Sequence, residues 1–293
     1  MSRTGLVVKN YNGYYYVASE GEIYPCKIRG RLKKERFSLL TGDKVVFTPS
    51  HPEGSIEEIL ERKNRLIKPA IANVDQIVLV FSLKNPDFNQ NVFDRFLVLT
   101  EQAGLPVYIC LSKADLLDDQ ELLDSITELY QNIGYKVLVV AKDDAKSFSA
   151  VKDILTDKIT VFAGMSGVGK STLLNQLFPR LQLSTGEVSD KNNRGRHTTR
   201  FSQLIDIGGG YIADTPGFSS AHLEGLVVTD VQKAFREFAR YSDRCRYLSC
   251  QHIAEPDCGV KDALANGLIN AQRYQNYCSI VEEIKEAEER KYK

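Results

Sequence analysis

The chain has 293 residues with 38 basic and 38 acidic side chains, so its net charge neither favours nor excludes a polyanionic partner. Its length predicts two or three domains that fold without disulfides, and its longest apolar runs, residues 77–81 and 137–141, are far shorter than the roughly 20 residues of a membrane span. The first residues lack the apolar core of a signal peptide, which predicts a cytoplasmic protein with free cysteines.

Residues 1–66 have the pattern of a small β domain. Short β-rich runs occur at residues 6–8, 14–17, 23–28 and 44–48. The first two flank Asn12-Gly13, a pair that tolerates the positive φ of a hairpin turn. Several short strands in so few residues favour a closed barrel, because closure removes exposed strand edges. We therefore expect an OB-like barrel.

A basic segment interrupts this β domain. Residues 27–36 hold a single acidic residue and six basic ones, namely Lys27, Arg29, Arg31, Lys33, Lys34 and Arg36. A basic loop near exposed tyrosines on a small barrel is typical of an RNA-binding surface. The alternative interpretation is an ordinary solvated hairpin.

From residue 67 to residue 221, apolar strands alternate with amphipathic helices. We expect strands at residues 74–81, 107–111, 137–141 and 159–162, and helices at residues 90–103, 120–133 and 147–155. This alternation predicts an α/β domain with a parallel sheet covered by helices. Ligands of such sheets bind at the carboxyl ends of the strands, where the motifs described below fall.

A glycine loop follows the expected strand at residues 159–162. Residues 164–171 match the phosphate-binding pattern G-x-x-x-x-G-K-[ST]. The glycines let successive backbone N–H groups turn toward a polyphosphate, and the helix that follows adds its positive end. Lys170 is expected to reach the β- and γ-phosphates, and Ser171 to bind Mg²⁺. The alternative is a strand-to-helix turn that binds nothing. The predicted nucleotide contacts here are Gly164, Met165, Ser166, Gly167, Val168, Gly169, Lys170, Ser171 and Thr172.

Near the C-terminus, cysteine and histidine occur with the spacing C-x4-C-x-H-x5-C. Cys245, Cys250, His252 and Cys258 offer three thiolates and one imidazole, a set suited to tetrahedral Zn²⁺. Four protein ligands leave no open position, so we expect one structural zinc per chain in a helical domain at residues 222–293. Chance clustering of free thiols is the alternative.

Three further motifs surround the glycine loop in the chain. They are S-K-A-D at residues 112–115, G-R-H-T-T at residues 195–199 and D-T-P-G at residues 214–217. Together with the loop they resemble the motif set of GTPases in rotated order, since ordinary GTPases place the glycine loop first and N-K-x-D last. This order is similar to that of the circularly permuted GTPases.

With the barrel before these motifs and the Cys/His cluster after them, the whole chain resembles the ribosome small subunit-dependent GTPase A (RsgA) family. The resemblance implies a multidomain α/β protein with an OB-like barrel at residues 1–66, a circularly permuted GTPase domain at residues 67–221 and a zinc-binding helical domain. It also implies a monomer that binds GTP, GDP and the rRNA of the small ribosomal subunit during late maturation, without a membrane partner.

The resemblance assigns the base-binding roles to residues 112–115. Asp115 accepts hydrogen bonds from guanine N1–H and its exocyclic amine, which adenine cannot offer, and Lys113 packs along the base, with Ala114 between them. The family pattern usually has Asn where this chain has Ser112. A hydroxyl makes fewer hydrogen bonds than an amide, so guanine binding is expected to be weaker.

The resemblance also assigns residues to Mg²⁺ and the γ-phosphate. Asp214 is expected to hold Mg²⁺ through water, and the Gly217 N–H to face the γ-phosphate. Thr199, or its neighbour Thr198, is expected to ligate Mg²⁺ in the triphosphate state. Loss of the γ-phosphate then releases both segments.

The hydrolytic group is expected to differ from that of Ras-like enzymes. Phe218 stands where those enzymes place the glutamine that orients water, and phenylalanine cannot do so. His197 is the expected replacement, acting with Lys170 and Thr199, and turnover without the subunit is expected to be slow. Two alternatives are an RNA-binding placeholder that senses nucleotide with negligible turnover, and an ATP-dependent kinase, which Asp115 disfavours.

Overall fold

A computed structural model describes residues 1–30, 38–67, 69–183, 203–214 and 223–291. The chain forms two compact units, the first made of residues 1–78, 148–162 and 170–219, the second of residues 79–147, 163–169 and 220–293. Two strands and one helix contribute residues to both units: β8 (Gln76–Ser82), β11 (Ile159–Ala163) and α4 (Ala145–Leu155). Across the described ranges, every helix is too short or too polar to cross a membrane.

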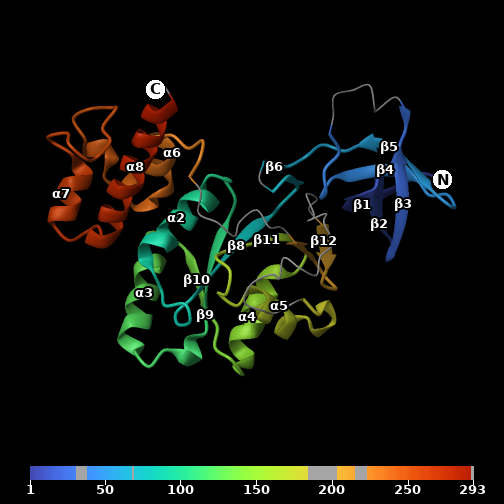
Figure 1. Cartoon of the computed structure of the whole chain (residues 1–293), viewed down its shortest axis with the longest axis horizontal. Coiled ribbons are helices and arrows are strands. Elements are labelled where there is room, and N and C mark those ends of the chain that lie inside the picture. The colour runs from blue at the N-terminus through green and yellow to red at the C-terminus, as the bar shows by residue number, and fades with distance from the viewer. Residues whose placement is uncertain (31–37, 68, 184–202, 215–222, 292–293) are drawn as a thin grey trace. The chain divides into compact units, whose positions relative to one another are not determined.

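Five strands close a barrel at the start of the first unit, drawn in blue in Figure 1. Its core consists of fully buried side chains that include Val17, Phe47 and Ile56. β1 pairs with both β2 and β4, which closes the ring in the order β1-β2-β3-β5-β4 and confirms the predicted barrel. The strands are β1 (Arg3–Tyr11), β2 (Tyr14–Ser19), β3 (Glu22–Ile28), β4 (Lys44–Thr48) and β5 (Gly54–Ile59).

The turn and the fifth strand of the barrel differ in how well the sequence predicts them. Asn12 and Gly13 adopt φ angles of 50° and 77°, which confirms the tight turn between β1 and β2. β5 was not predicted, because its sequence G-S-I-E-E-I carries two glutamates and only two apolar side chains. It pairs with β3 and β4, and its Ile56 side chain is fully buried in the barrel core while Ile59 is partly buried against it.

The rest of the first unit includes three strands beside the barrel. β13 (Tyr211–Asp214) is parallel to β11 and antiparallel to β12 (Gln203–Asp206), which in turn pairs with β1. The buried Gln76 amide donates to the carbonyl oxygen of Ile154 (2.6 Å) and to the Thr160 hydroxyl (3.0 Å), joining β8 to α4 and β11. The remaining elements are β6 (Arg65–Leu66), β7 (Ile71–Ala72), α5 (Lys170–Leu177) and the 3₁₀ turn η2 (Pro179–Leu181).

The first part of the second unit contains three neighbouring strands, in the order β10-β9-β8, and the helices α2 and α3. Both helices begin at a side-chain cap, since Asn89 accepts from the Val92 N–H and Asp119 from the Leu122 N–H. β9 and β10 are parallel, as the alternation of strands and helices predicts. The elements are α2 (Gln90–Glu101), β9 (Val107–Ser112), the 3₁₀ turn η1 (Ala114–Leu116), α3 (Gln120–Ile133) and β10 (Lys136–Val139).

The second unit ends in a helical module, drawn in orange and red in Figure 1. Its core is aromatic, with Phe235, Phe238 and Tyr277 buried and their ring centroids 4.9–5.3 Å apart. These side chains pack the interior, as their helical spacing suggests. The elements are α6 (Val228–Ala234), the 3₁₀ turns η4 (Arg236–Arg240) and η5 (Ser242–Arg244), α7 (Gly259–Ala265) and α8 (Ala271–Lys291).

A buried ionic network joins this module to α2 and α3. The Arg273 side chain is 1% exposed, and its Nε donates to Glu237 Oε1 at 2.6 Å. The same guanidinium pairs with the buried Asp94 carboxylate on α2. That carboxylate also accepts from the Tyr130 hydroxyl (2.9 Å) and the Asn276 amide (2.6 Å). Each buried carboxylate therefore has the cation and the hydrogen bonds that burial demands.

Candidate nucleotide site and metal centre

The glycine loop at residues 164–169 has the backbone that a phosphate loop needs. Gly164 adopts φ of 131°, and a Cβ there would lie 2.1 Å from the carbonyl oxygen of Val80. Only glycine fits such a close approach of two backbones. Gly169 also has a positive φ, 94°, and helix α5 begins at the next residue, Lys170. The loop therefore leads from a buried strand directly into a helix N-terminus, as the motif predicts.

The S-K-A-D segment is tied to this loop by two side chains. The buried Ser112, at the end of β9, donates its hydroxyl to the carbonyl oxygen of Val168 at 2.6 Å, and the carbonyl oxygen of Phe81 lies 3.2 Å away. Lys113 adopts φ of 59° and donates its Nζ to the carbonyl oxygen of Gly167 at 2.8 Å. It also contacts the Asn85 carbonyl oxygen. The base motif and the glycine loop therefore form one hydrogen-bonded assembly within the second unit.

Asp115 is held by the backbone of the next strand end. Its Oδ1 accepts from the Lys142 N–H at 2.7 Å, while the carboxylate itself is exposed. The Ala114 N–H donates to the carbonyl oxygen of Val140 at 3.1 Å, which fixes the turn that carries Asp115. No motif in the sequence marks residues 140–142 as part of this site. Their signal is their position directly after the parallel strand β10, where ligand-binding loops of such sheets occur.

Helix α5 carries the first residues after the loop. Lys170 is half-buried, and burial lowers the pKa of its amine to about 8 because a low-dielectric environment disfavours the charged form. Ser171 is half-buried and Thr172 is exposed. Asp214 is the last residue of β13. His197, Thr198, Thr199, Gly217 and Phe218 lie outside the described residues.

Only part of the basic segment of the barrel is described. Lys27, on β3, pairs with Glu53 at 2.8 Å. Arg29 lies 3.6 Å from Glu57, with 69% of its side chain exposed. Both cations are therefore at the surface, each beside one carboxylate. Arg31, Lys33, Lys34 and Arg36 lie outside the described residues.

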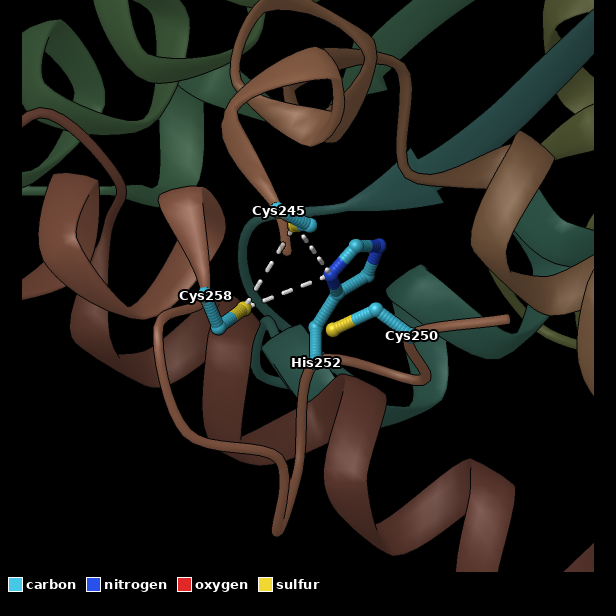
Figure 2. Close-up of side chains that lie close together, drawn as sticks. All are labelled: Cys245, Cys250, His252 and Cys258. Atoms are coloured by element: carbon cyan, nitrogen blue, oxygen red, sulfur yellow. Dashed lines mark hydrogen bonds between the residues drawn. The ribbon is translucent and has the colours of Figure 1, made fainter. Parts of the chain in front are cut away.

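The four predicted metal ligands converge in the helical module (Figure 2). The Cys258 Sγ and the Cys245 Sγ lie 3.9 Å apart, and they lie 3.4 Å and 3.5 Å from His252 Nδ1. With Cys250 included, all four ligand atoms are within 4.8 Å of one another. Tetrahedral zinc with bonds of about 2.3 Å to sulfur and 2.0 Å to nitrogen gives edges of roughly 3.5–3.8 Å. Three of the edges already match those values, so the cluster can hold a metal ion.

The environment of the cluster suits a buried metal. Cys250, His252 and Cys258 are buried, and burial lowers the pKa of the imidazole, which favours the neutral form that can donate a lone pair. The loop is fixed from outside by two hydroxyls of α8: Tyr274 donates to the His252 carbonyl oxygen and Tyr277 to that of Gln251, both at 2.6 Å. The other three cysteines, Cys26, Cys110 and Cys278, form no disulfide and are not part of this group of ligands.

The glycine loop is hydrogen-bonded to the S-K-A-D segment, which precedes it in the chain, and this order of motifs is that of the circularly permuted GTPases. Comparison with known proteins gives the family. Residues 59–224 match the RsgA GTPase family, and residues 4–56 match the RsgA N-terminal domain. The chain belongs to the RsgA GTPase family and is a GTP hydrolase.

Relatives match the chain along nearly its whole length. The protein named small ribosomal subunit biogenesis GTPase RsgA from Geobacillus sp. (strain WCH70) is 45% identical over 98% of this chain and 99% of its own. The protein of the same name from Streptococcus pneumoniae is 44% identical over 97% and 96%.

Solved structures agree with this relationship. YjeQ from Thermotoga maritima superposes with a TM-score of 0.85 at 35% identity, covering 97% of this chain and 99% of that one. YloQ, described as a circularly permuted GTPase, superposes with a TM-score of 0.82 at 38% identity, covering 98% and 96%.

Proposed function

We propose that this chain binds the small ribosomal subunit late in its maturation and that GTP hydrolysis times its release. The observation that carries the proposal is the full-length similarity to proteins named for small ribosomal subunit biogenesis. In this proposal three domains divide the work. The barrel (residues 1–66) and the helical domain (residues 222–293) hold rRNA or ribosomal protein, and the GTPase domain (residues 67–221) responds to nucleotide.

The base-binding step depends on Asp115. Its carboxylate is exposed and one oxygen is held by the Lys142 N–H, which supports a fixed orientation toward guanine N1–H and the exocyclic amine. Ser112 and Lys113 position the segment through the glycine loop, with the Lys113 stem along the base. The N–H groups of residues 164–169, the Lys170 amine and the N-terminus of α5 receive the phosphates.

Mg²⁺ is the metal that this triphosphate chemistry uses. Its candidate ligands are the Ser171 hydroxyl at the start of α5, Asp214 through water and Thr199 in the triphosphate state. Hard oxygen groups of this kind suit Mg²⁺, which neutralises charge on the β- and γ-oxygens. The Gly217 N–H donates a hydrogen bond to the γ-phosphate. Thr198 is the alternative to Thr199 as the Mg²⁺ ligand.

His197 is the proposed group that positions the attacking water, since Phe218 cannot do so. We expect His197→Ala to lower subunit-stimulated turnover while GDP affinity stays within a few-fold. Single-turnover hydrolysis and nucleotide titration measure the two quantities separately. Equal turnover in the variant and the parent rejects the role.

Zinc is the metal proposed for Cys245, Cys250, His252 and Cys258, one ion per chain. Three sulfur ligands and one imidazole favour zinc over the hard cations. With four protein ligands the ion is structural, and it stabilises the module that we propose to bind the subunit.

The basic residues of the barrel are the proposed RNA contacts. They are Lys27, Arg29, Arg31, Lys33, Lys34 and Arg36.

The direct test is phosphate release from GTP with and without purified small ribosomal subunits. We expect slow release alone and a large increase as subunits are titrated, from a monomer that works in the cytoplasm. Binding to subunits without any increase in phosphate release favours the second candidate, a nucleotide-sensing placeholder, for which Phe218 in the water-positioning place is the specific observation. Absence of subunit binding in both nucleotide states contradicts both candidates.

A further inference from the structure

The Asn175 side chain, on helix α5, makes two hydrogen bonds to the backbone of a single later residue. Its Nδ2 donates to the carbonyl oxygen of Leu183 at 2.8 Å, and its Oδ1 accepts from the Leu183 N–H, also at 2.8 Å. Both bonds are partly buried. A carboxamide can bind both backbone groups of one residue because it carries a donor and an acceptor side by side. Leu183 is therefore fixed to α5 by a side chain rather than by a helix or sheet ladder.

Helix α5 is the helix that follows the glycine loop, and Asn175 lies on a particular face of it. The helix begins at Lys170, and Ser171, the proposed Mg²⁺ ligand, precedes Asn175 by four residues. Side chains four residues apart lie on the same face of a helix, about one turn from each other. Asn175 therefore holds residue 183 one turn away from the proposed Mg²⁺ position, on the same face of the helix.

A compact turn brings the chain from the end of α5 back to Asn175. The Phe178 N–H donates to the carbonyl oxygen of Leu174 at 2.8 Å, the 3₁₀ turn η2 follows, and Gln182 adopts φ of 47°. This left-handed conformation reverses the chain just before Leu183. Asparagine is a weak helix former because its side chain competes for backbone hydrogen bonds. At position 175 that property serves to bind the backbone of the returning chain.

Leu183 is the last described residue before residues 184–202, the range that contains the proposed groups His197 and Thr199. The first described residue after that range is Gln203, the cross-strand partner of Asp214 at the end of β13. The chain on either side of the range is thus attached to an element that carries a proposed Mg²⁺ ligand. The attachment is a strand pairing on one side and the Asn175 carboxamide on the other.

We infer that Asn175 is a positioning residue for GTP hydrolysis: it holds residue 183 beside the Mg²⁺-binding face of α5, so that the chain leading to His197 and Thr199 starts from a fixed point. GDP binding does not require these two bonds, because the glycine loop is held by the S-K-A-D segment. Asn175 therefore acts on turnover and not on GDP affinity. For the roles of His197 and Thr199 this inference rests on the proposed function.

The first experiment measures single-turnover GTP hydrolysis and GDP affinity in the full chain. Asn175→Ala removes both hydrogen bonds. We expect it to slow hydrolysis at least about tenfold, with and without small subunits, while GDP affinity stays within about twofold. Asn175→Asp keeps an acceptor for the Leu183 N–H but sets a carboxylate against the Leu183 carbonyl oxygen, so it is expected to be as slow as the alanine variant.

The matched control is Gln176→Ala. Gln176 is the next residue of α5 and also carries a carboxamide, but its side chain is exposed. This variant is expected to hydrolyse GTP and bind GDP like the parent. It separates the effect of the Asn175 contacts from a general effect of replacing an amide on this helix.

Hydrogen exchange at the Leu183 amide tests the contact itself. This N–H donates to Asn175 Oδ1, so we expect slow exchange in the parent and in Gln176→Ala. In Asn175→Ala the same amide is expected to exchange at least about tenfold faster. Unchanged exchange at Leu183 in the alanine variant would show that the carboxamide does not hold this residue, and would overturn the inference.

Three results of the hydrolysis experiment also overturn it. They are an alanine variant that hydrolyses GTP at the rate of the parent, a loss of GDP affinity as large as the loss of turnover, and equal slowing in Gln176→Ala. The second result would mean that Asn175 only supports the fold of α5. Stimulation of the parent by small subunits is measured in the same preparations. Its absence contradicts the proposed function, whereas hydrolysis without subunits still decides the role of Asn175.

Discussion

The nucleotide loop and the Cys/His cluster are organised in different ways. The nucleotide loop is held by hydrogen bonds within the protein. The Ser112 hydroxyl and the Lys113 amine donate to carbonyl oxygens of the loop, and the Asp115 carboxylate accepts from a backbone N–H. At the Cys/His cluster, four potential metal ligands lie close together. The contacts among Cys245, His252 and Cys258 are weak thiol–thiol and thiol–imidazole contacts of 3.4–3.9 Å.

The two sites therefore differ in whether they need their ligand to keep their structure. A loop held by hydrogen bonds to the chain keeps its shape when the nucleotide leaves, which suits a protein that hydrolyses GTP and then exchanges GDP for GTP. A cluster of three thiols and an imidazole that binds an ion gains most of its cohesion from that ion, so we expect folding of the helical module to depend on the metal. We therefore expect nucleotide removal to alter function and metal removal to alter folding.

The strongest test of this contrast is removal of the metal. Cys258→Ser is expected to unfold the helical module, because a structural zinc ion of the kind proposed for this cluster contributes on the order of 10 kcal/mol, as much as the stability of a whole domain. Hydrogen exchange should rise throughout residues 228–291 and stay unchanged in the barrel. Cys278→Ser is the control, since Cys278 is a free cysteine outside the cluster. Equal protection in the two variants would mean that the module folds without the ion.

The ionic network is the second support of the same module, and the next largest effect is expected there. Arg273→Met leaves the Asp94 and Glu237 carboxylates buried without their cation, at a cost of about 3–5 kcal/mol. Thermal unfolding should report this as a clear fall in Tm. The exposed pair of Arg290 with Glu286 provides the control, and Arg290→Met should shift Tm little. Similar Tm values for Arg273→Met and Arg290→Met would show that the ionic network does not stabilise the module.

A smaller effect is expected at the nucleotide loop. Ser112→Ala removes the donor to the Val168 carbonyl oxygen, a loss of about 1–3 kcal/mol that loosens the loop. GDP and GTP affinities should both fall, by about fivefold or more, while the helical module keeps its exchange protection. Ser147→Ala is the control, because its hydroxyl also donates to a backbone carbonyl, that of Asp144, on the exposed surface. An unchanged nucleotide affinity in Ser112→Ala would show that the loop does not depend on this bond.

The smallest effect is a pH dependence at Lys170. Its pKa of about 8 without nucleotide rises when phosphates bind, because they favour the charged form. Affinity should therefore be constant below pH 8 and fall above it, by at most about tenfold per pH unit. Calorimetry at pH 7.0, 8.0 and 9.0 measures it, and Lys170→Met controls for titration of the nucleotide itself. The same slope in both proteins would place the titrating group elsewhere.

The sequence predicted the parts of the molecule that depend on local pattern. The Asn12-Gly13 turn, the helix at residues 120–133 and the spacing of the Cys/His cluster each follow from a few neighbouring residues, and the structure confirms them. The barrel was predicted from four strands, and β5 was missed because half of its side chains face outward and are polar. The roles of residues in the switch segments, His197 and Thr199 included, stay predictions.

Long-range chemistry was beyond what the sequence pattern could show. Asp94, Glu237 and Arg273 are separated by 179 residues at the extremes, and each one alone looks like a solvated charge on a helix. The hydrogen bond from Lys142 to Asp115 is donated by a backbone N–H, which nearly every residue type has, so the sequence does not mark it.

Replacing the Asp115 carboxylate by an amide tests directly whether this side chain binds the guanine base. Asp115→Asn is expected to lose GDP affinity and gain affinity for xanthosine diphosphate, because the amide N–H can donate to the oxygen that xanthine carries in place of guanine's amine. Calorimetric titration of the parent and the variant with both nucleotides measures this reversal. A parent that prefers xanthosine or adenosine diphosphate, or a variant that keeps the preference of the parent for GDP, would contradict it.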